Sequence, residues 1–370
     1  MKILQISFKD PTRTKGGIES VIFNLSKNLL KNGNEIDILC TSEDNYIKNT
    51  EIGRIISIKT PNFDFLGLKG NLIKKLFYNI KIKNFIKLHN KEYDVVHVHG
   101  DVGGLKEFKN LKTVATFHGF TAANPAYKKY LKRIFLFIFS ANTEFKNLKY
   151  CKKITVVSNN VKLQMKNYTD KDIDVIYNGI DLDFFKKISK QEKIRLKYKL
   201  NLKENKKYIL FVGTQSWIKG LDIAINTIRL LKREDIVLNV IGLKRPKNFK
   251  EPNINFLGLL EKEKIINYYQ VSDLFIMPSR YEGFSIVVLE AMACGLPVIL
   301  ANNIGSSEII KNNINGISIN NTSKNFSSQI KKILADVKLK NKIIENSFNT
   351  IKKFDWKYIT VIYINLYNNI

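Results

Sequence analysis

The stretch Glu282-Gly-Phe-Ser-Ile-Val-Val-Leu-Glu290 decides the fold, because it joins an apolar run to a helix through a short polar loop. Apolar Leu274-Phe-Ile-Met277 precedes it, and the small residues Ala291-Met-Ala293 follow. This order predicts a buried strand over residues 272–277, a loop at Glu282 and a helix over residues 284–294. A strand that leads into a helix in this way is typical of a parallel α/β sheet.

The carboxylates at the two ends of this stretch predict a site for an elongated polar ligand. A helix rises about 1.5 Å per residue. Glu290 should therefore lie about two turns down a helix that starts near Gly283, with Glu282 in the preceding loop. The backbone N–H groups of Gly283, Phe284 and Ser285 would point at an anion between the carboxylates. A sugar, a diphosphate and a ribose in a row would fit. The alternative is a solvated charge at each end of a buried helix.

Strand and helix patterns alternate through both halves of the chain. We expect strands at 3–7, 35–40, 94–100, 113–119, 153–158, 174–177, 208–213, 237–242, 255–257, 272–277 and 297–301. We expect helices at 16–30, 220–231, 262–270 and 284–294, and a helical turn at 306–311. The pattern predicts two doubly wound Rossmann-like α/β domains, residues 1–185 and 186–354. Ligands bind outside the carboxyl ends of such strands, so two facing domains would form a cleft.

Composition limits the classes of function. The chain has 370 residues, 44% of them hydrophobic, and no apolar run reaches the ~18–20 residues of a membrane span. Its first residues are typical of a buried strand rather than a secretory signal. Cys40, Cys151 and Cys294 are too far apart for a Cys-x-x-Cys pair, which argues for a reducing cytosol.

The net charge of +28 raises the question of a polyanionic partner. We expect no nucleic acid, because the sequence contains no nucleic-acid-binding module and the charge is spread over both halves. An acidic membrane surface is the favoured partner.

Four motifs resemble one enzyme family. They are Met277-Pro-Ser-Arg-Tyr-Glu-Gly-Phe-Ser with Glu-Ala-Met-Ala-Cys-Gly-Leu-Pro-Val298, Gly-Gly-Ile-Glu at 16–19, Val-Ile-Tyr-Asn-Gly-Ile-Asp at 175–181, and Val-Gly with Lys-Gly at 212–220. Together they resemble the retaining GT-B glycosyltransferases of family 4 (group 1), whose signature is Glu-x7-Glu. The resemblance covers nearly the whole chain.

The resemblance implies an activity. A hexose or related sugar would pass from a nucleoside diphosphate donor, with UDP or GDP, to a hydroxyl acceptor with retention of anomeric configuration. The acceptor would be a lipid-linked saccharide or a precursor of a cell-surface glycan. The first domain would hold it, and a C-terminal helix at about 355–370 would pack back on that domain. We expect neither a metal nor a cofactor beyond the donor.

Several second-half residues would bind the donor. Lys219 precedes a glycine that opens a helix, a good position for a phosphate ligand. By resemblance Glu290 would accept from the ribose hydroxyls and Glu282 from the sugar hydroxyls. Thr214 stands where the family usually has an arginine, and Arg280, Lys244 and Arg245 are all candidates to replace that charge.

First-half residues would complete the site. By resemblance Gly16 and Gly17 lie beside the diphosphate and the acceptor, and His118 is a catalytic contact near the transferred sugar, together with Glu282 and Lys219. His99 could line the acceptor pocket. His97 is equally well a core histidine, and a metal site formed by the three histidines is the remaining alternative.

Two basic segments could meet a membrane. Residues 69–91 carry seven lysines among apolar residues, and residues 127–139 mix lysine with aromatics. Helices of this kind lie at membrane interfaces, although each could equally bury its apolar side on the sheet. We therefore expect a cytoplasmic protein, peripheral at the inner face of the membrane. The alternative functions are a GT-B nucleotide-sugar epimerase and a non-catalytic protein that binds lipids or polyanions.

Overall fold

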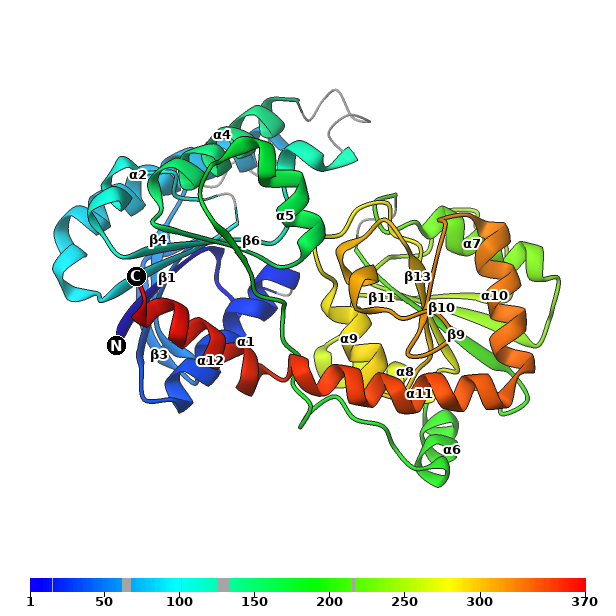
Figure 1. Ribbon diagram of the computed structural model, residues 1–370. Helices are drawn as coiled ribbons and strands as arrows, with labels where there is room; N and C mark the ends of the chain where they lie inside the picture. Colours follow the sequence, from blue (N-terminus) through cyan, green and yellow to red (C-terminus); the bar gives the residue numbers. More distant parts are fainter. Residues whose placement is uncertain (15, 62–67, 101, 126–133, 215–216) are drawn as a thin grey trace. The chain divides into compact units, whose positions relative to one another are not determined.

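The computed structural model describes residues 1–14, 16–61, 68–100, 102–125, 134–214 and 217–370. Its contacts divide the chain into two compact units (Figure 1). Unit 1 is Met1–Gly179 with Trp356–Ile370, and unit 2 is Ile180–Asp355. The chain therefore leaves unit 1 after Gly179 and returns to it at Trp356. A Cβ atom on Gly179 would lie 2.4 Å from the Trp356 ring, so only glycine fits at this crossing.

Unit 1 is built on an eight-stranded sheet with the order β3-β4-β2-β1-β5-β6-β7-β8. All neighbouring strands are parallel except β3 and β4, which form an antiparallel hairpin at one edge. The strands are β1 (Lys2–Lys9), β2 (Glu35–Ser42), β3 (Tyr46–Thr50), β4 (Gly53–Lys59), β5 (Val95–His99), β6 (Thr113–Phe117), β7 (Lys153–Val156) and β8 (Ile173–Val175).

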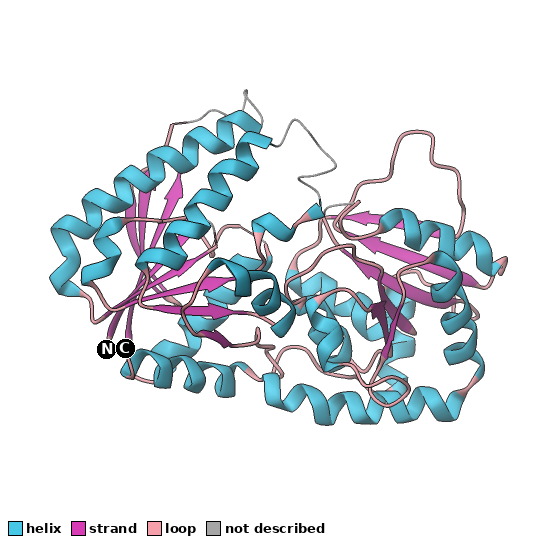
Figure 2. Ribbon diagram, turned by 45° about the horizontal axis from the view of Figure 1, so that its top comes forward, coloured by secondary structure: helices cyan, strands magenta, loops and turns pink. Residues whose placement is uncertain are grey.

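Helices cover both faces of this sheet. The α-helices are α1 (Gly17–Lys31), α2 (Leu68–His89), α4 (Ile134–Tyr150), α5 (Asn159–Met165) and α12 (Trp356–Asn368). Helix α2 packs with α4 on one face, and α1 packs with the C-terminal helix α12 on the other (Figure 1). Both chain ends lie at the same end of unit 1 (Figures 1 and 2).

Unit 2 has a six-stranded, fully parallel sheet with the order β11-β10-β9-β12-β13-β14. Its strands are β9 (Lys207–Val212), β10 (Ile236–Ile241), β11 (Ile254–Gly258), β12 (Leu274–Met277), β13 (Val298–Ala301) and β14 (Ile317–Ile319). Its α-helices are α6 (Lys190–Lys199), α7 (Leu221–Leu231), α8 (Lys262–Val271), α9 (Ile286–Ala293), α10 (Ser323–Ala335) and α11 (Val337–Ile351). Helix α7 packs with α10, α9 with α11, and α6 with α8.

These two sheets confirm the predicted fold class of two doubly wound α/β units. The hairpin β3–β4 and the short strand β14 were not predicted. Strand β3 is largely exposed, so its residues lack the apolar alternation that marks a half-buried strand. Helix α9 begins at Ile286, two residues later than predicted, because Ser285 is still extended.

Within the described ranges, no helix is both long enough and apolar enough to cross a membrane. Cys40, Cys151 and Cys294 are all buried free thiols.

Candidate functional site

Lys219 and Glu282 form an ion pair at the carboxyl edge of the sheet of unit 2. The Lys219 ammonium donates to Glu282 Oε2, and the two side chains are 21% and 19% exposed. Lys219 lies in the loop between β9 and α7, and Glu282 lies in the loop between β12 and α9. Two residues that are 63 positions apart in sequence are therefore in contact beside the N-termini of two helices. Both helix ends favour negative charge.

Glycines allow the two loops to approach each other so closely. Gly220, the N-cap of α7, has a φ of +74°, and a Cβ atom there would lie 1.9 Å from the Pro278 carbonyl oxygen. A Cβ on Gly213 would lie 2.8 Å from Cγ of Lys219, so the lysine stem already fills that space. Any larger residue at Gly220 would separate the loops and move Lys219 away from Glu282.

The loop that carries Glu282 is held by neighbouring segments. Gly305 N–H donates to the Glu282 carbonyl oxygen at 3.0 Å, and Asn321 Nδ2 donates to the Pro278 carbonyl oxygen at 3.0 Å. Ser285 N–H donates to Ser306 Oγ at 2.6 Å. Ser285 N–H, predicted to point at a ligand, therefore has a hydrogen-bond partner inside the protein.

Phe284 also packs inward. Its buried ring stacks on Phe354 with centroids 5.9 Å apart. Gly283 lies between Glu282 and Phe284 and is itself buried. Of the predicted donor-binding residues in this loop, Glu282 is the one whose charged side chain reaches the carboxyl edge together with Lys219.

Glu290 lies a little more than one turn into α9, rather than the two turns that the sequence predicted. Its Oε2 accepts from the hydroxyl of the buried Tyr269 in α8 at 2.8 Å. Burial raises the pKa of Glu290 to about 7, while the Tyr269 hydrogen bond and the charge of Lys262 act in the opposite direction. The carboxyl group is thus poised to change charge near neutral pH.

Arg280, one candidate for the charge that the family arginine supplies at Thr214, is already paired within unit 2. Arg280 makes a bidentate pair with Asp222, at 2.8 and 2.6 Å, and donates to the Trp217 carbonyl oxygen at 2.6 Å. Its guanidinium group also lies 4.8 Å from the centre of the Trp217 ring. Arg245 is exposed and donates to the Glu251 carbonyl oxygen at 3.3 Å, and Lys244 is exposed as well.

The predicted first-half residues meet at the carboxyl edge of unit 1. Gly16 is the N-cap of α1 in extended conformation, and Gly17 is its first residue. A Cβ on Gly100, which directly follows β5, would lie 3.6 Å from Ile18 of the same helix. His118 follows β6, the neighbour of β5, and is half-buried. The structure therefore brings Gly16, Gly17 and His118 to one edge.

His99 and His97 lie deeper. His99, expected to line the acceptor pocket, is only 2% exposed. Its Nε2 faces Gln5 Oε1 at 3.0 Å and its Nδ1 faces His118 Nε2 at 3.2 Å, so it reaches the edge only through His118. His97 contacts the Tyr367 hydroxyl and Thr116 Oγ1, both at 2.6 Å, as a core histidine would.

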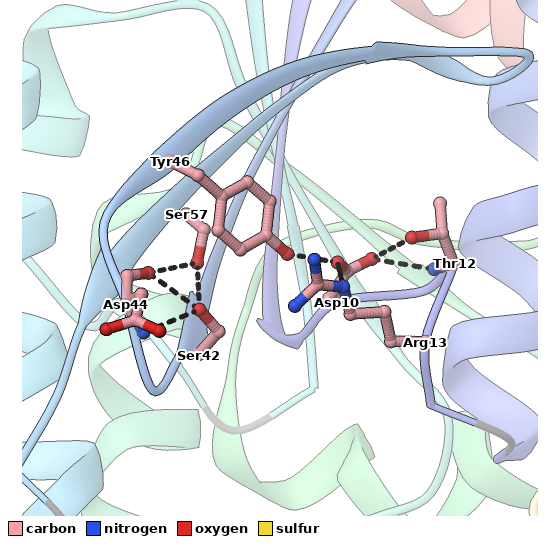
Figure 3. Close-up of polar contacts among 7 residues, drawn as sticks. All are labelled: Asp10, Thr12, Arg13, Ser42, Asp44, Tyr46 and Ser57. Carbon is pink, nitrogen blue, oxygen red and sulfur yellow. Dashed lines mark hydrogen bonds and ion pairs between the residues drawn. The ribbon is translucent and has the colours of Figure 1, made fainter.

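The sequence analysis did not predict a cluster of polar contacts around Asp10. Asp10 Oδ1 accepts from the backbone N–H and the hydroxyl of Thr12, both at 2.7 Å, and Oδ2 accepts from the Tyr46 hydroxyl (Figure 3). The Arg13 guanidinium lies 4.6 Å from the centre of the Tyr46 ring. These contacts tie the loop that leads to Gly16 to strand β3. The Asp-Pro pair at 10–11 is a turn signal that could have revealed it.

Among the residues that the structure describes, no group of three or more His, Cys, Asp or Glu side chains could hold a metal ion. His97, His99 and His118 contact one another and neighbouring polar groups instead.

Comparison with known sequences gives matches over both units. The family described as Glycosyltransferase Family 4 matches residues 15–184, and Glycosyl transferases group 1 matches residues 190–350. An uncharacterised glycosyltransferase of Methanocaldococcus jannaschii is 27% identical, with 99% of this chain and 98% of the relative covered. N,N'-diacetylbacillosaminyl-diphospho-undecaprenol alpha-1,3-N-acetylgalactosaminyltransferase of Campylobacter jejuni is 29% identical, over 52% of this chain and 53% of the relative.

Solved structures match over the full length. Sucrose-phosphate synthase from Thermosynechococcus elongatus superposes with a TM-score of 0.83 at 19% identity, covering 100% of this chain and 98% of that one. HepE of Anabaena, in complex with UDP-glucose, gives a TM-score of 0.76 at 16% identity and covers 100% of both chains. At these identities the structures establish the fold. Together with the two family matches, they identify the chain as a glycosyltransferase of the GT-B fold.

Proposed function

We propose that the protein transfers a hexose or related sugar from a nucleoside diphosphate donor to a hydroxyl group, with retention of anomeric configuration. The observation that carries this proposal is the ion pair of Lys219 and Glu282 at the N-termini of α7 and α9. A diphosphate would compete with Glu282 for the Lys219 ammonium group. The released carboxylate could then accept hydrogen bonds from the hydroxyl groups of the sugar.

The chemistry follows from where charge develops. When the bond between the anomeric carbon and the β-phosphate oxygen breaks, negative charge grows on the leaving diphosphate. Lys219 and the positive end of α7 would stabilise that charge, and they are already in place before the reaction. The acceptor oxygen would form its bond on the same face of the sugar and pass its proton to the leaving phosphate. Glu290 would accept from the ribose, and His118 would contact the transferred sugar.

Two relatives suggest substrates. HepE was crystallised with UDP-glucose, which supports a uridine nucleotide as the first donor to test. The Campylobacter jejuni relative is named for an acceptor on undecaprenyl diphosphate, which supports a lipid-linked acceptor. We propose both for this chain.

Thermal unfolding with candidate nucleotides tests the donor. A ligand at one hundred times its Kd stabilises the native protein by about 2.7 kcal/mol. We expect UDP or GDP to raise Tm, whereas NAD should not. If no nucleoside diphosphate raises Tm, the proposal is wrong. With the matching nucleotide sugar, release of the diphosphate should require an acceptor. Conversion of the donor to its epimer without acceptor would favour an epimerase instead.

Glu290→Ala should weaken nucleotide binding roughly tenfold or more, since a hydrogen bond to a charged group contributes about 1.5–3 kcal/mol. Calorimetry with UDP measures this change. Because burial raises the pKa of Glu290 to about 7, UDP binding should strengthen more from pH 6 to pH 8 in the native protein than in Glu290→Gln, where only UDP itself titrates. Tyr269→Phe is the matched control. It removes the hydroxyl that donates to the Glu290 carboxylate and leaves the carboxylate itself in place. Unchanged UDP affinity in Glu290→Ala would remove Glu290 from the site.

We also propose that unit 1 binds acidic membranes. Helix α2 exposes four large apolar side chains, Leu76, Phe77, Ile80 and Leu88, the last two 57% and 79% exposed. Exposed Lys81, Lys83 and Lys87 lie among them, and Lys83 is 3.4 Å from Glu107. The second basic segment, 127–139, falls largely outside the described residues. Helix α2 therefore carries this proposal.

Replacing Lys81 and Lys87 with glutamate should reduce binding to acidic liposomes tenfold or more. Each lysine near an acidic surface contributes about 1 kcal/mol, and each glutamate is repelled. Co-sedimentation at low and high salt measures the loss, and high salt should weaken binding of the native protein as well. Lys331→Glu with Lys338→Glu changes the net charge equally in unit 2 and should have little effect. Equal, negligible binding to acidic and neutral liposomes would contradict the proposal.

A further inference from the structure

A chain of polar side chains runs from the centre of unit 1 to its carboxyl edge and ends at His118. Gln5 in β1 is fully buried, and its Oε1 lies 3.0 Å from His99 Nε2. His99 Nδ1 lies 3.2 Å from His118 Nε2. We call Gln5, His99 and His118 the relay. His118 is the member that is half-buried rather than fully enclosed.

The relay has a direction because its members are neutral. Burial lowers the pKa of His118 to about 4 and that of His99 well below its usual value, so neither ring is charged near pH 7. A neutral imidazole has one N–H and one lone pair, so the role of one nitrogen fixes the role of the other. In the observed orientation of the Gln5 amide, Oε1 faces His99 and can only accept, so His99 carries its proton on Nε2 and accepts at Nδ1. Gln5 Nε2 is buried and has no hydrogen-bond partner among the described residues.

The same logic fixes His118. Its Nε2 faces the lone pair of His99 Nδ1 and must therefore carry the proton. Its Nδ1 is left with a lone pair and can only accept. An N···N distance of 3.2 Å is within the range of an ordinary hydrogen bond.

The adjacent His97 belongs to a separate network. Its ring centre is only 4.0 Å from that of His99, yet its two nitrogens contact Tyr367 and Thr116 rather than a relay member. This separation provides a control in the same core, because a change at Tyr367 alters the partner of His97 without removing any hydrogen bond of the relay.

We propose that Gln5 and His99 are positioning residues that hold His118 in its Nε2–H tautomer, so that Nδ1 accepts a hydrogen bond from a hydroxyl of the transferred sugar. This inference rests on the proposed role of His118 in the transfer reaction. It also gives His99 a part that its burial permits: His99 acts through His118 and touches neither acceptor nor donor.

Nitrogen-15 NMR of the histidine rings in the full chain tests the proton order without any substrate. At pH 7 we expect the proton on Nε2 of both His99 and His118, with a coupling between His118 Nε2 and His99 Nδ1 across their hydrogen bond. Gln5→Met keeps the side-chain length and should abolish that fixed order. A proton on Nδ1 of His118 in the native protein would overturn the proposal.

Activity of paired variants gives the second readout. An asparagine oxygen at position 99 would lie close to where Nδ1 lies and can accept from His118, whereas leucine cannot. His99→Asn should therefore keep the His118 tautomer and most of kcat/KM. His99→Leu and Gln5→Met, each made as a single variant, should lower kcat/KM about tenfold. Tyr367→Phe should leave both readouts unchanged.

The two variants at position 99 also distinguish a folding defect from the loss of the hydrogen bond, because both replace the buried imidazole but only asparagine can accept from His118. If His99→Leu and Gln5→Met fold and keep full kcat/KM, the relay does not position His118. If the protein transfers no sugar at all, the proposed function fails. The NMR result would still decide the proton order by itself.

Discussion

Lys219→Met should lower turnover by about 10²–10³, the loss that follows removal of one preorganised donor to a developing charge. Methionine is a sharper substitution than alanine. The lysine stem fills the space beside Gly213, and the methionine side chain would still fill it. The change then removes only the ammonium group. Steady-state kinetics with saturating donor and acceptor measures the loss, and affinity for uridine without phosphates should change little.

Glu282→Gln provides a test with the opposite sign. It removes the carboxylate that competes for Lys219, so affinity for UDP should rise while turnover of the sugar donor falls. Lys331→Met, at an exposed site on α10, is the control for loss of one positive charge. Full turnover in Lys219→Met would contradict the assigned role. Lys244 would then be the next cation to replace, since Arg280 is held by Asp222.

Acidification from pH 7 to pH 5 should destabilise unit 1 by at least about 4 kcal/mol. Burial lowers the pKa of His97 to about 3 and that of His118 to about 4. Below an unfolded-state pKa of about 6.5 the unfolded chain binds more protons than the native one, so stability falls as pH falls. Each of these two histidines contributes about 2 kcal/mol of that loss. His99 adds to it in the same direction.

No charged partner offsets this effect within the described contacts of the three rings. They contact Gln5 of β1, Thr116 of β6, and Tyr363 and Tyr367 of α12. Burial raises the pKa of Tyr363 to about 12 and that of Tyr367 well above its usual value, so neither ionises between pH 5 and 7. Glu290 has the opposite sign: its raised pKa makes unit 2 relatively more stable in acid.

The measurement must therefore report on unit 1 alone. Hydrogen exchange of backbone amides in β5 and β6 at pH 7, 6 and 5, corrected for intrinsic rates, does so. His89→Gln is the matched control, because the His89 side chain is exposed and pairs with Glu92 outside the buried cluster. In this variant the loss of stability of unit 1 in acid should be the same as in the native protein. If amide protection in β5 and β6 yields a stability independent of pH, the three histidines are not buried as neutral groups.

Local pattern was sufficient for most of the architecture. Central strands such as β5 and β12 are buried along their whole length, so β12 appears in the sequence as an unbroken apolar run, and β5 is apolar apart from His97 and His99. The edge hairpin β3–β4 was missed because an exposed edge strand lacks that run. The start of α9 was misplaced because the hydroxyl of Ser306, which lies 21 residues further on, binds Ser285 N–H and holds the loop extended.

For the site, the sequence by itself was enough to predict the residues that we propose bind a sugar nucleotide: Lys219, Glu282, Glu290 and His118, each next to a glycine or on a helix that follows a strand. Only the tertiary structure decided their partners. Lys219 pairs with Glu282, and Arg280 pairs with Asp222. His99 is enclosed between Gln5 and His118. Spacing along the chain sets which residues reach the carboxyl edge of a sheet. Which charge meets which, and which imidazole nitrogen holds its proton, depends on contacts between strands and loops that are far apart in sequence.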